Sequence, residues 1–288
     1  MTAATKAKAA DVEATGETDA PLLTFVEEPP APTHLNTLLY GPPGSGKSTA
    51  AATSPGPILW VNAEGGNALA FARKIARERD TRILEVRIDP NDQTAPLTVK
   101  QTLSEVYRLV RSGGEPQVQT VVVDTVAKLR EALAAQIVVP GAKNSIQQWG
   151  DVAKALGGFV KAFRDLPVNL VLLCHEEVSD VEGDRIVRPL IGGALSETIP
   201  GEVDVMAYCG AHREENEVVY LGQLVEGRGR RAKDRSGSLG SVRPLDLTEW
   251  LQAFREGLGT AEALPWDEAP PELDPEDEAL SLDLPEVS

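Results

Sequence analysis

Eight consecutive residues near the start of the chain have the types and spacing needed to hold the phosphates of a nucleotide. They satisfy the pattern Gly-x-x-x-x-Gly-Lys-Ser, directly after an apolar run and before a helix-forming run. Glycines let backbone N–H groups close around phosphate oxygens, a lysine ammonium reaches the β- and γ-phosphates, and a serine hydroxyl ligates Mg²⁺. The pattern predicts a site for ATP and Mg²⁺ formed by Gly41, Pro42, Pro43, Gly44, Ser45, Gly46, Lys47 and Ser48.

Three further polar residues follow apolar runs that read as strands. Asp124 ends the run TVVVD and is the candidate to hold Mg²⁺ through its water shell; the alternative is a cap of the next helix. Glu64 follows ILWVN and is the candidate general base for an attacking water, or else a surface residue before a glycine pair. His175 follows NLVLLC, where a polar side chain could contact the γ-phosphate, or simply be solvated.

These polar side chains can act together only if the ends of their strands lie side by side, as they do in a parallel sheet. The middle of the chain has the pattern of such a sheet. Short β-rich runs alternate with helical stretches, which is typical of a mainly parallel sheet with helices on both faces. The predicted strands are Thr37–Tyr40, Ile58–Asn62, Ile83–Ile88, Thr120–Asp124 and Asn169–Cys174. The predicted helices are Lys47–Ala52, Ala68–Arg79, Thr98–Arg111, Val126–Ile137 and Trp149–Asp165.

Beyond His175 the pattern changes to β-hairpins. Glu182-Gly183 is expected to turn the first, and His212–Asn216 to join Val205–Cys209 to Val218–Leu224. A last helix is predicted from Asp246 to about Glu256, because Asp246 and Glu249 have capping-box spacing. The predicted fold class is therefore α/β, with a parallel core followed by antiparallel hairpins.

The acidity of the chain is concentrated at its two ends. The net charge is −16, but residues 261–288 contain ten acidic residues and no Lys or Arg, and residues 1–33 contain six acids against two lysines. Both segments lack helix and strand periodicity, so we expect disordered acidic tails at 1–33 and 261–288 around one ATPase domain at 34–260. That domain is nearly neutral, so the total charge does not exclude DNA as a partner.

Other compositional features favour a soluble cytoplasmic protein. No apolar run approaches the roughly 18 residues that span a bilayer, and the N-terminus lacks a signal-peptide core, so no membrane association is expected. The two cysteines, Cys174 and Cys209, lie in apolar runs without metal-binding spacing. We expect both to be buried and reduced.

The sequence resembles the RecA-like ATPases, and most closely the phage-encoded RecA-like single-strand annealing proteins, a group of phage nucleotide-binding AAA-type ATPases. The resemblance covers about residues 34–260 and rests on HLNTLLYGPPGSGKS, WVNAEGG, TVVVDT, VLLCHEE and RAKDRSG. It implies a RecA-like P-loop core in which Glu64 is the catalytic glutamate. It also implies a sensor at the end of the Asn169–Cys174 strand, where His175 replaces the usual glutamine.

The segment RAKDRSG resembles the Lys-x-Arg finger of hexameric RecA-type helicases. The resemblance implies that Lys233 and Arg235 reach the γ-phosphate bound by a neighbouring subunit, and hence a homo-oligomer, either a ring or a filament. The alternatives are a solvated basic loop and a patch that contacts DNA phosphates without a catalytic role.

Nucleic-acid contacts are expected at two places where RecA-like proteins carry DNA-binding loops. One is the loop Pro140–Gln148, with Lys143 and the following Trp149; the other is the hairpin with Arg185 and Arg188. Trp149 could instead belong to the core, and the hairpin could be an ordinary β-ribbon.

The function expected from the resemblance is an ATPase that acts on single-stranded DNA in phage-type recombination or annealing. A DnaB-type helicase or helicase loader is the alternative within the same class. A small-molecule kinase of the adenylate kinase type and a nucleotide-gated scaffold are alternatives from other classes. The acidic tail could recruit a single-strand binding or other replication protein.

Overall fold

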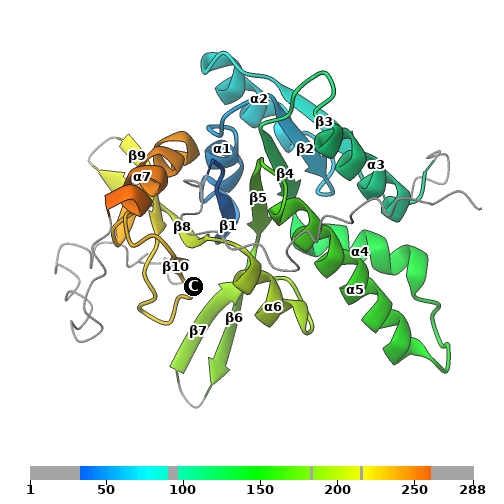
Figure 1. The fold of residues 1–288 in the computed structure, drawn as a ribbon. Helices are drawn as coiled ribbons and strands as arrows, with labels where there is room; N and C mark the ends of the chain where they lie inside the picture. The colour runs from blue at the N-terminus through cyan, green and yellow to red at the C-terminus, as the bar shows by residue number, and fades with distance from the viewer. Residues whose placement is uncertain (1–32, 90–96, 182–183, 215–216, 261–288) are drawn as a thin grey trace, which may run out of the picture. The chain divides into compact units, whose positions relative to one another are not determined.

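The structure is a computed structural model that describes residues 33–89, 97–181, 184–214 and 217–260 (Figure 1). The acidic segments 1–32 and 261–288 lie outside the described residues. So do the turn at Glu182-Gly183 and the tip of the second predicted hairpin at residues 215–216. The predicted disorder and the predicted turns therefore stay predictions.

A nine-stranded sheet forms the centre of the described part of the chain, in the order β11-β9-β8-β1-β5-β4-β2-β3, with β10 paired to β8. The run from β3 to β8 is parallel, and β9, β10 and β11 are antiparallel. The strands are β1 (Asn36–Tyr40), β2 (Ile58–Asn62), β3 (Ile83–Arg87), β4 (Thr120–Asp124), β5 (Asn169–Cys174), β8 (Val205–Glu214), β9 (Glu217–Gln223), β10 (Lys233–Asp234) and β11 (Val242–Pro244).

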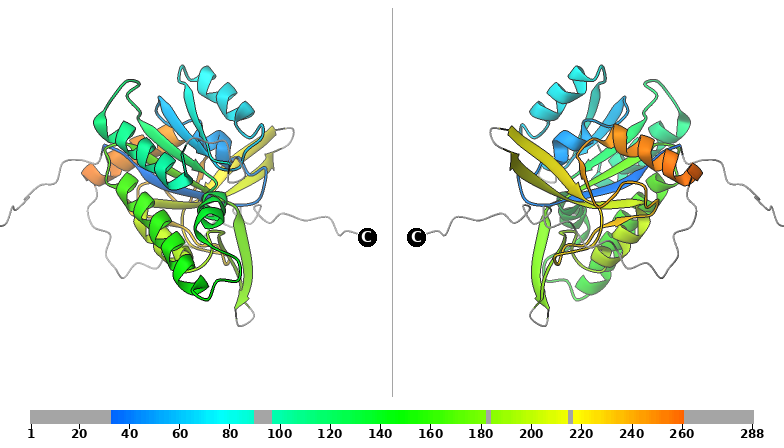
Figure 2. Two further views of the ribbon diagram at one scale, coloured as in Figure 1. Left: turned by 90° about the vertical axis from the view of Figure 1, so that its right-hand side faces the viewer. Right: turned by 90° about the vertical axis from the view of Figure 1, so that its left-hand side faces the viewer.

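Helices cover both faces of this sheet (Figures 1 and 2). One face packs against α3 (Val99–Ser112), α4 (Val126–Ile137), α5 (Ser145–Arg164) and α6 (Leu195–Glu202). The other packs against α1 (Lys47–Ala51), α2 (Leu69–Glu78) and α7 (Leu247–Thr260). The central strands are apolar on both faces because both are covered, as in other parallel sheets. The predicted α/β fold class, a mainly parallel sheet flanked by helices with antiparallel strands towards the C-terminal end, is confirmed.

The two predicted hairpins also form. β6 (Glu176–Val181) and β7 (Asp184–Pro189) make a separate two-stranded antiparallel sheet. β8 and β9 make the second hairpin, and β8 continues to Glu214, five residues beyond the predicted end at Cys209. The last helix is capped at the predicted position, because the Asp246 carboxylate accepts hydrogen bonds from the N–H groups of Thr248 and Glu249.

Several boundaries and short elements differ from the sequence predictions. α5 begins at Ser145, four residues before the predicted start, so the second half of the predicted loop Pro140–Gln148 is helical. The polar pair Gln147-Gln148 interrupts the apolar period that would have marked this first turn. The helix α6 was not predicted, because it is short and contains Pro200; β10 and β11 are too short to show a strand period.

Both cysteines are confirmed as buried and free. Cys174 ends β5 and Cys209 lies in β8, on opposite faces of the sheet. Burial raises the pKa of each thiol, which keeps both in the unreactive protonated form.

Candidate nucleotide site

The predicted phosphate loop follows β1 and leads directly into α1. Gly44 and Gly46 have left-handed φ angles of 80° and 86°, which side chains rarely adopt. Gly41 is needed for a different reason: a Cβ on this residue would lie 2.4 Å from the carbonyl oxygen of Cys209. These three glycines let the chain turn tightly at the carboxyl edge of the sheet, with the first N–H groups of α1 available to an anion.

Lys47 is the charged group of this loop and is almost fully buried. Its ammonium donates hydrogen bonds to the carbonyl oxygens of Gly41 (2.9 Å) and Pro42 (2.7 Å) and to Oγ of Ser45 (3.2 Å). Burial lowers the pKa of Lys47, and the negative groups around it act in the opposite direction. All three acceptors are neutral, so phosphate oxygens would be stronger partners for the same ammonium.

Asp124 ends β4 and is 4% exposed. Within the described residues its Oδ2 is buried without a hydrogen-bond partner. Burial, followed by the nearby carboxylate of Glu64, raises the pKa of Asp124 to about 6. The indole N–H of Trp60 is also buried without a partner among the described residues, and it lies close enough to this carboxylate to lower its pKa in part. The Oδ2 atom itself forms no hydrogen bond in the described part of the chain, which fits a divalent cation or one of its waters, and Ser48 at the start of α1 would supply the hydroxyl ligand. The cap of α4 is Thr125, whose hydroxyl accepts from the N–H of Lys128, so the alternative role of Asp124 as helix cap is not observed.

Glu64 follows β2 and contacts residues that follow two neighbouring strands. Its carboxylate accepts a hydrogen bond from the Thr125 hydroxyl (3.2 Å) and lies 3.5 Å from Nε2 of His175. Its backbone N–H donates to the carbonyl oxygen of Asp124 (3.0 Å). Both the Glu64 and His175 side chains are about a third exposed, so water reaches the carboxylate. The predicted trio of Glu64, Asp124 and His175 is therefore brought together at one edge of the sheet.

The sequence reasoning missed two residues that position Glu64. Thr125 binds its carboxylate directly; the threonine that follows the acid in TVVVDT was the available signal. Asn62 accepts a hydrogen bond from the N–H of Gly65 (2.9 Å) and donates to Glu85 (2.9 Å). Asn62 thereby holds the turn that carries Glu64, which is a buried polar contact that no sequence pattern marks.

Lys233 and Arg235 lie elsewhere. β10 pairs with Val205 and Met206 in the first half of β8, whereas the phosphate loop follows the carboxyl end of the neighbouring β1. Arg235 lies 3.4 Å from the Asp204 carboxylate and donates to the carbonyl oxygen of Gly201. The structure therefore does not bring these two cations to the phosphate loop of their own chain.

Lys233 instead lines a cavity of about 530 Å³ bordered by the β6–β7 hairpin and α6. Arg188 and Arg231 line the same cavity; Arg188 pairs with Glu177 (3.1 Å), and Arg231 pairs with Glu226 (3.6 Å). Burial lowers the pKa of Lys233, and Arg235 adds to that effect.

The other residues named for nucleic-acid contact are accessible. Arg185 and Lys143 are exposed, and Trp149 is 42% exposed, so its alternative assignment to the core is wrong. The Arg130 guanidinium lies over the Trp149 ring, 4.7 Å from its centroid. Trp149 and Arg130 thus form a cation–π pair in which the indole is exposed and the arginine is half-buried.

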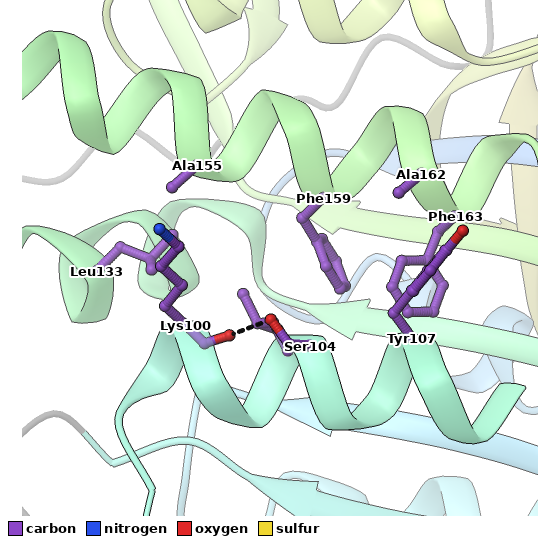
Figure 3. A pocket seen from close by; sticks show the side chains of 9 residues that line it. Lys100, Ser104, Tyr107, Leu133, Ala155, Phe159, Ala162 and Phe163 are labelled. Carbon is purple, nitrogen blue, oxygen red and sulfur yellow. Dashed lines mark hydrogen bonds between the residues drawn. The ribbon is translucent and has the colours of Figure 1, made fainter. Parts of the chain in front are cut away.

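A separate groove of about 230 Å³ lies between α3, α4 and α5 (Figure 3). Its walls include the rings of Tyr107, Phe159 and Phe163. None of the predicted site residues lines it, and apart from Lys100 and Ser104 its lining is aliphatic or aromatic, which does not suit a triphosphate. The candidate site is therefore the strand edge with the phosphate loop.

The raised pKa of Asp124 gives a test that does not depend on catalysis. A carboxyl whose folded pKa is raised destabilises the fold once it ionises, so the cost is absent below pH 3.8 and complete above about pH 6. The difference corresponds to about 3 kcal/mol. In urea unfolding without Mg²⁺, Asp124→Asn should therefore be more stable than wild type at pH 8, by up to this amount, and the gain should shrink towards pH 4.

Asp151→Asn, at an exposed position on α5, is the control and should show no such gain. Equal stability of wild type and Asp124→Asn at pH 8 would show that Asp124 is not held in an unfavourable ionised state. The same Asp124 variant should lose Mg²⁺-dependent ATP hydrolysis, so stability and activity should change in opposite directions.

The comparison with protein families agrees with a nucleotide site. The model of a protein family described as "AAA domain" matches residues 33–236. No curated protein matches the chain. Among solved structures, a KaiC-like protein from the hyperthermophilic archaeon Pyrococcus horikoshii is similar, with 17% identity over 65% of this chain and 76% of that chain and a TM-score of 0.38. Across the described residues, no helix is long and apolar enough to cross a membrane.

Proposed function

The chain belongs to the AAA domain family, and from this premise we propose that it hydrolyses ATP with Mg²⁺ and uses the reaction to act on single-stranded DNA, as in recombination or annealing. One observation carries the hydrolysis: Glu64, Asp124, His175 and the phosphate loop meet at the carboxyl edge of the sheet.

Each residue has a distinct part in this proposal. Lys47 and the N–H groups of the loop bind the phosphates, and Ser48 and Asp124 hold the cation that neutralises their charge. Glu64 orients a water and accepts its proton, with Thr125 and His175 fixing the direction of the carboxylate. The His175 side chain lies against Glu64, the proposed general base. Because β6 begins at the next residue, His175 connects the nucleotide site to the β6–β7 hairpin.

Assembly into a homo-oligomer completes the proposal. Lys233 lines the cavity beside α6 and Arg235 pairs with Asp204, so on this proposal their part in hydrolysis is played at the phosphate loop of a second copy of the chain. An ATPase rate per subunit that rises with protein concentration supports such assembly. A rate that is independent of concentration, in protein shown to be monomeric, counts against it.

The DNA part of the proposal is supported by the exposed ring of Trp149 and the half-buried Arg130 beside it. An aromatic ring that stacks on a base contributes about 1–3 kcal/mol. Trp149→Ala should therefore raise the concentration of single-stranded DNA that half-maximally stimulates ATP hydrolysis by about 5- to 100-fold. The measurement is the ATPase rate over a DNA titration, with and without the substitution.

Phe71→Ala is the matched control, because Phe71 is 61% exposed on α2, across the sheet from α5. It should leave the DNA titration unchanged. If Trp149→Ala behaves like this control, Trp149 does not contact DNA; if wild-type ATPase does not respond to single-stranded DNA at all, the DNA part of the proposal fails.

A further inference from the structure

The β8–β9 hairpin extends past the phosphate loop on one side. β1 ends at Tyr40, which pairs with Tyr208, but β8 continues to Glu214. The residues of β9 that pair with the extension therefore stand beyond the end of β1, beside the loop that starts at Gly41. Figure 1 shows β8, β9 and α1 in this part of the fold.

Tyr220 of β9 packs directly on the phosphate loop. A Cβ placed on Gly46 would lie 2.7 Å from Cδ1 and 2.8 Å from Cγ of the Tyr220 ring. The strand register agrees with this contact: Tyr220 pairs with Ala211, two residues beyond Cys209, whose side chain lies in the core on the α1 face. Since side chains alternate along a strand, Tyr220 lies on the α1 face as well.

Tyr220 is nevertheless not a core residue. Tyr220 is 37% exposed, and no hydrogen bond of its hydroxyl is seen within the described residues. By contrast, the neighbouring position on the same face, Gly222, is covered by the indole of Trp250. More than a third of Tyr220 thus remains accessible to a ligand, although the ring also contacts the loop.

We propose that Tyr220 is the platform on which the purine base of the bound nucleotide stacks. The inference rests on the proposed binding of a nucleoside triphosphate at the loop. The N–H groups around Gly46 and the first turn of α1 would hold the phosphates, so the base would be left to side chains that adjoin this turn, and Tyr220 is one of them. Every base has a π-face, so stacking alone favours large bases without separating adenine from guanine. ATP and GTP should bind with similar affinity, and CTP and UTP more weakly.

The experiment compares ATP with inorganic tripolyphosphate, each measured with Mg²⁺ by calorimetry. Tyr220→Ala should weaken ATP binding by about 5- to 100-fold and change tripolyphosphate binding by less than about twofold. Tyr220→Phe keeps the ring and should bind ATP like wild type. A fluorescent 2-aminopurine riboside triphosphate should be quenched by wild type and by Tyr220→Phe, but not by Tyr220→Ala.

The comparison of ATP with tripolyphosphate distinguishes base stacking on Tyr220 from a merely structural role of its ring. If Tyr220→Ala weakens both ligands equally, the ring only supports the loop, and the proposal is overturned. If wild type binds tripolyphosphate as tightly as ATP, no base platform exists, although the phosphate site stands. If wild type binds neither ligand, both the platform and the proposed function fail. Thermal unfolding of each variant shows whether the fold is retained.

Discussion

Glu64→Gln is expected to lower the rate of ATP hydrolysis by about 10²–10⁴-fold while leaving ATP affinity within about threefold of wild type. Glutamine has nearly the same shape and can still accept the hydrogen bond from Thr125, but it cannot take a proton from the attacking water. The loss should therefore fall on kcat and spare binding. Single-turnover hydrolysis and equilibrium binding of ATP, measured on the same preparation, separate the two quantities.

Glu78→Gln is the matched control, since Glu78 is exposed on α2 and contacts only Lys74 among the pairs seen. It should hydrolyse ATP at the wild-type rate. If Glu64→Gln turns over ATP within a factor of about three of wild type, Glu64 is not the base. Thr125→Val extends the test: it removes the hydroxyl that orients the Glu64 carboxylate, so kcat should fall by less than in Glu64→Gln, again with little change in affinity.

The central sheet and the main site residues could be predicted because local patterns determine them. The apolar runs ILWVN, TVVVD and NLVLLC read as buried parallel strands, and polar residues at their ends meet at one edge. The register bears this out: Asn62 lies beside Asp124, and Asp124 beside Leu173, one residue before the end of β5. This reasoning predicts that Glu64, Asp124 and His175 lie close together, as they do, while their roles in hydrolysis stay predictions.

Residues placed by long-range pairing could not be found in this way. Tyr220 contacts Gly46 because β8 pairs with β1 and extends beyond its end. This arrangement depends on a strand register that no local sequence pattern encodes. Lys233 is placed by a two-residue strand whose partner lies 27 residues earlier in the chain. Short strands of this kind derive their stability from the sheet they join and carry little propensity of their own.

Lys47→Ala is expected to weaken ATP binding by about 10²–10⁴-fold, because the ammonium gives charge-assisted hydrogen bonds to two phosphates and each is worth about 1.5–3 kcal/mol. Hydrolysis should fall with binding, which distinguishes this variant from Glu64→Gln. The measurement is the equilibrium dissociation constant of Mg²⁺–ATP.

The burial of Lys47 makes a control for the shape of the loop necessary. Its ammonium joins the carbonyl oxygens of Gly41 and Pro42 to Ser45, so its removal could loosen the loop itself. Lys47→Met fills the same buried space without the charge and should lose as much affinity as Lys47→Ala. Lys128→Ala, which removes an exposed ammonium paired with Glu131, should bind ATP like wild type. Recovery of near wild-type affinity in Lys47→Met would mean that Lys47 shapes the loop and that its charge does not bind phosphate.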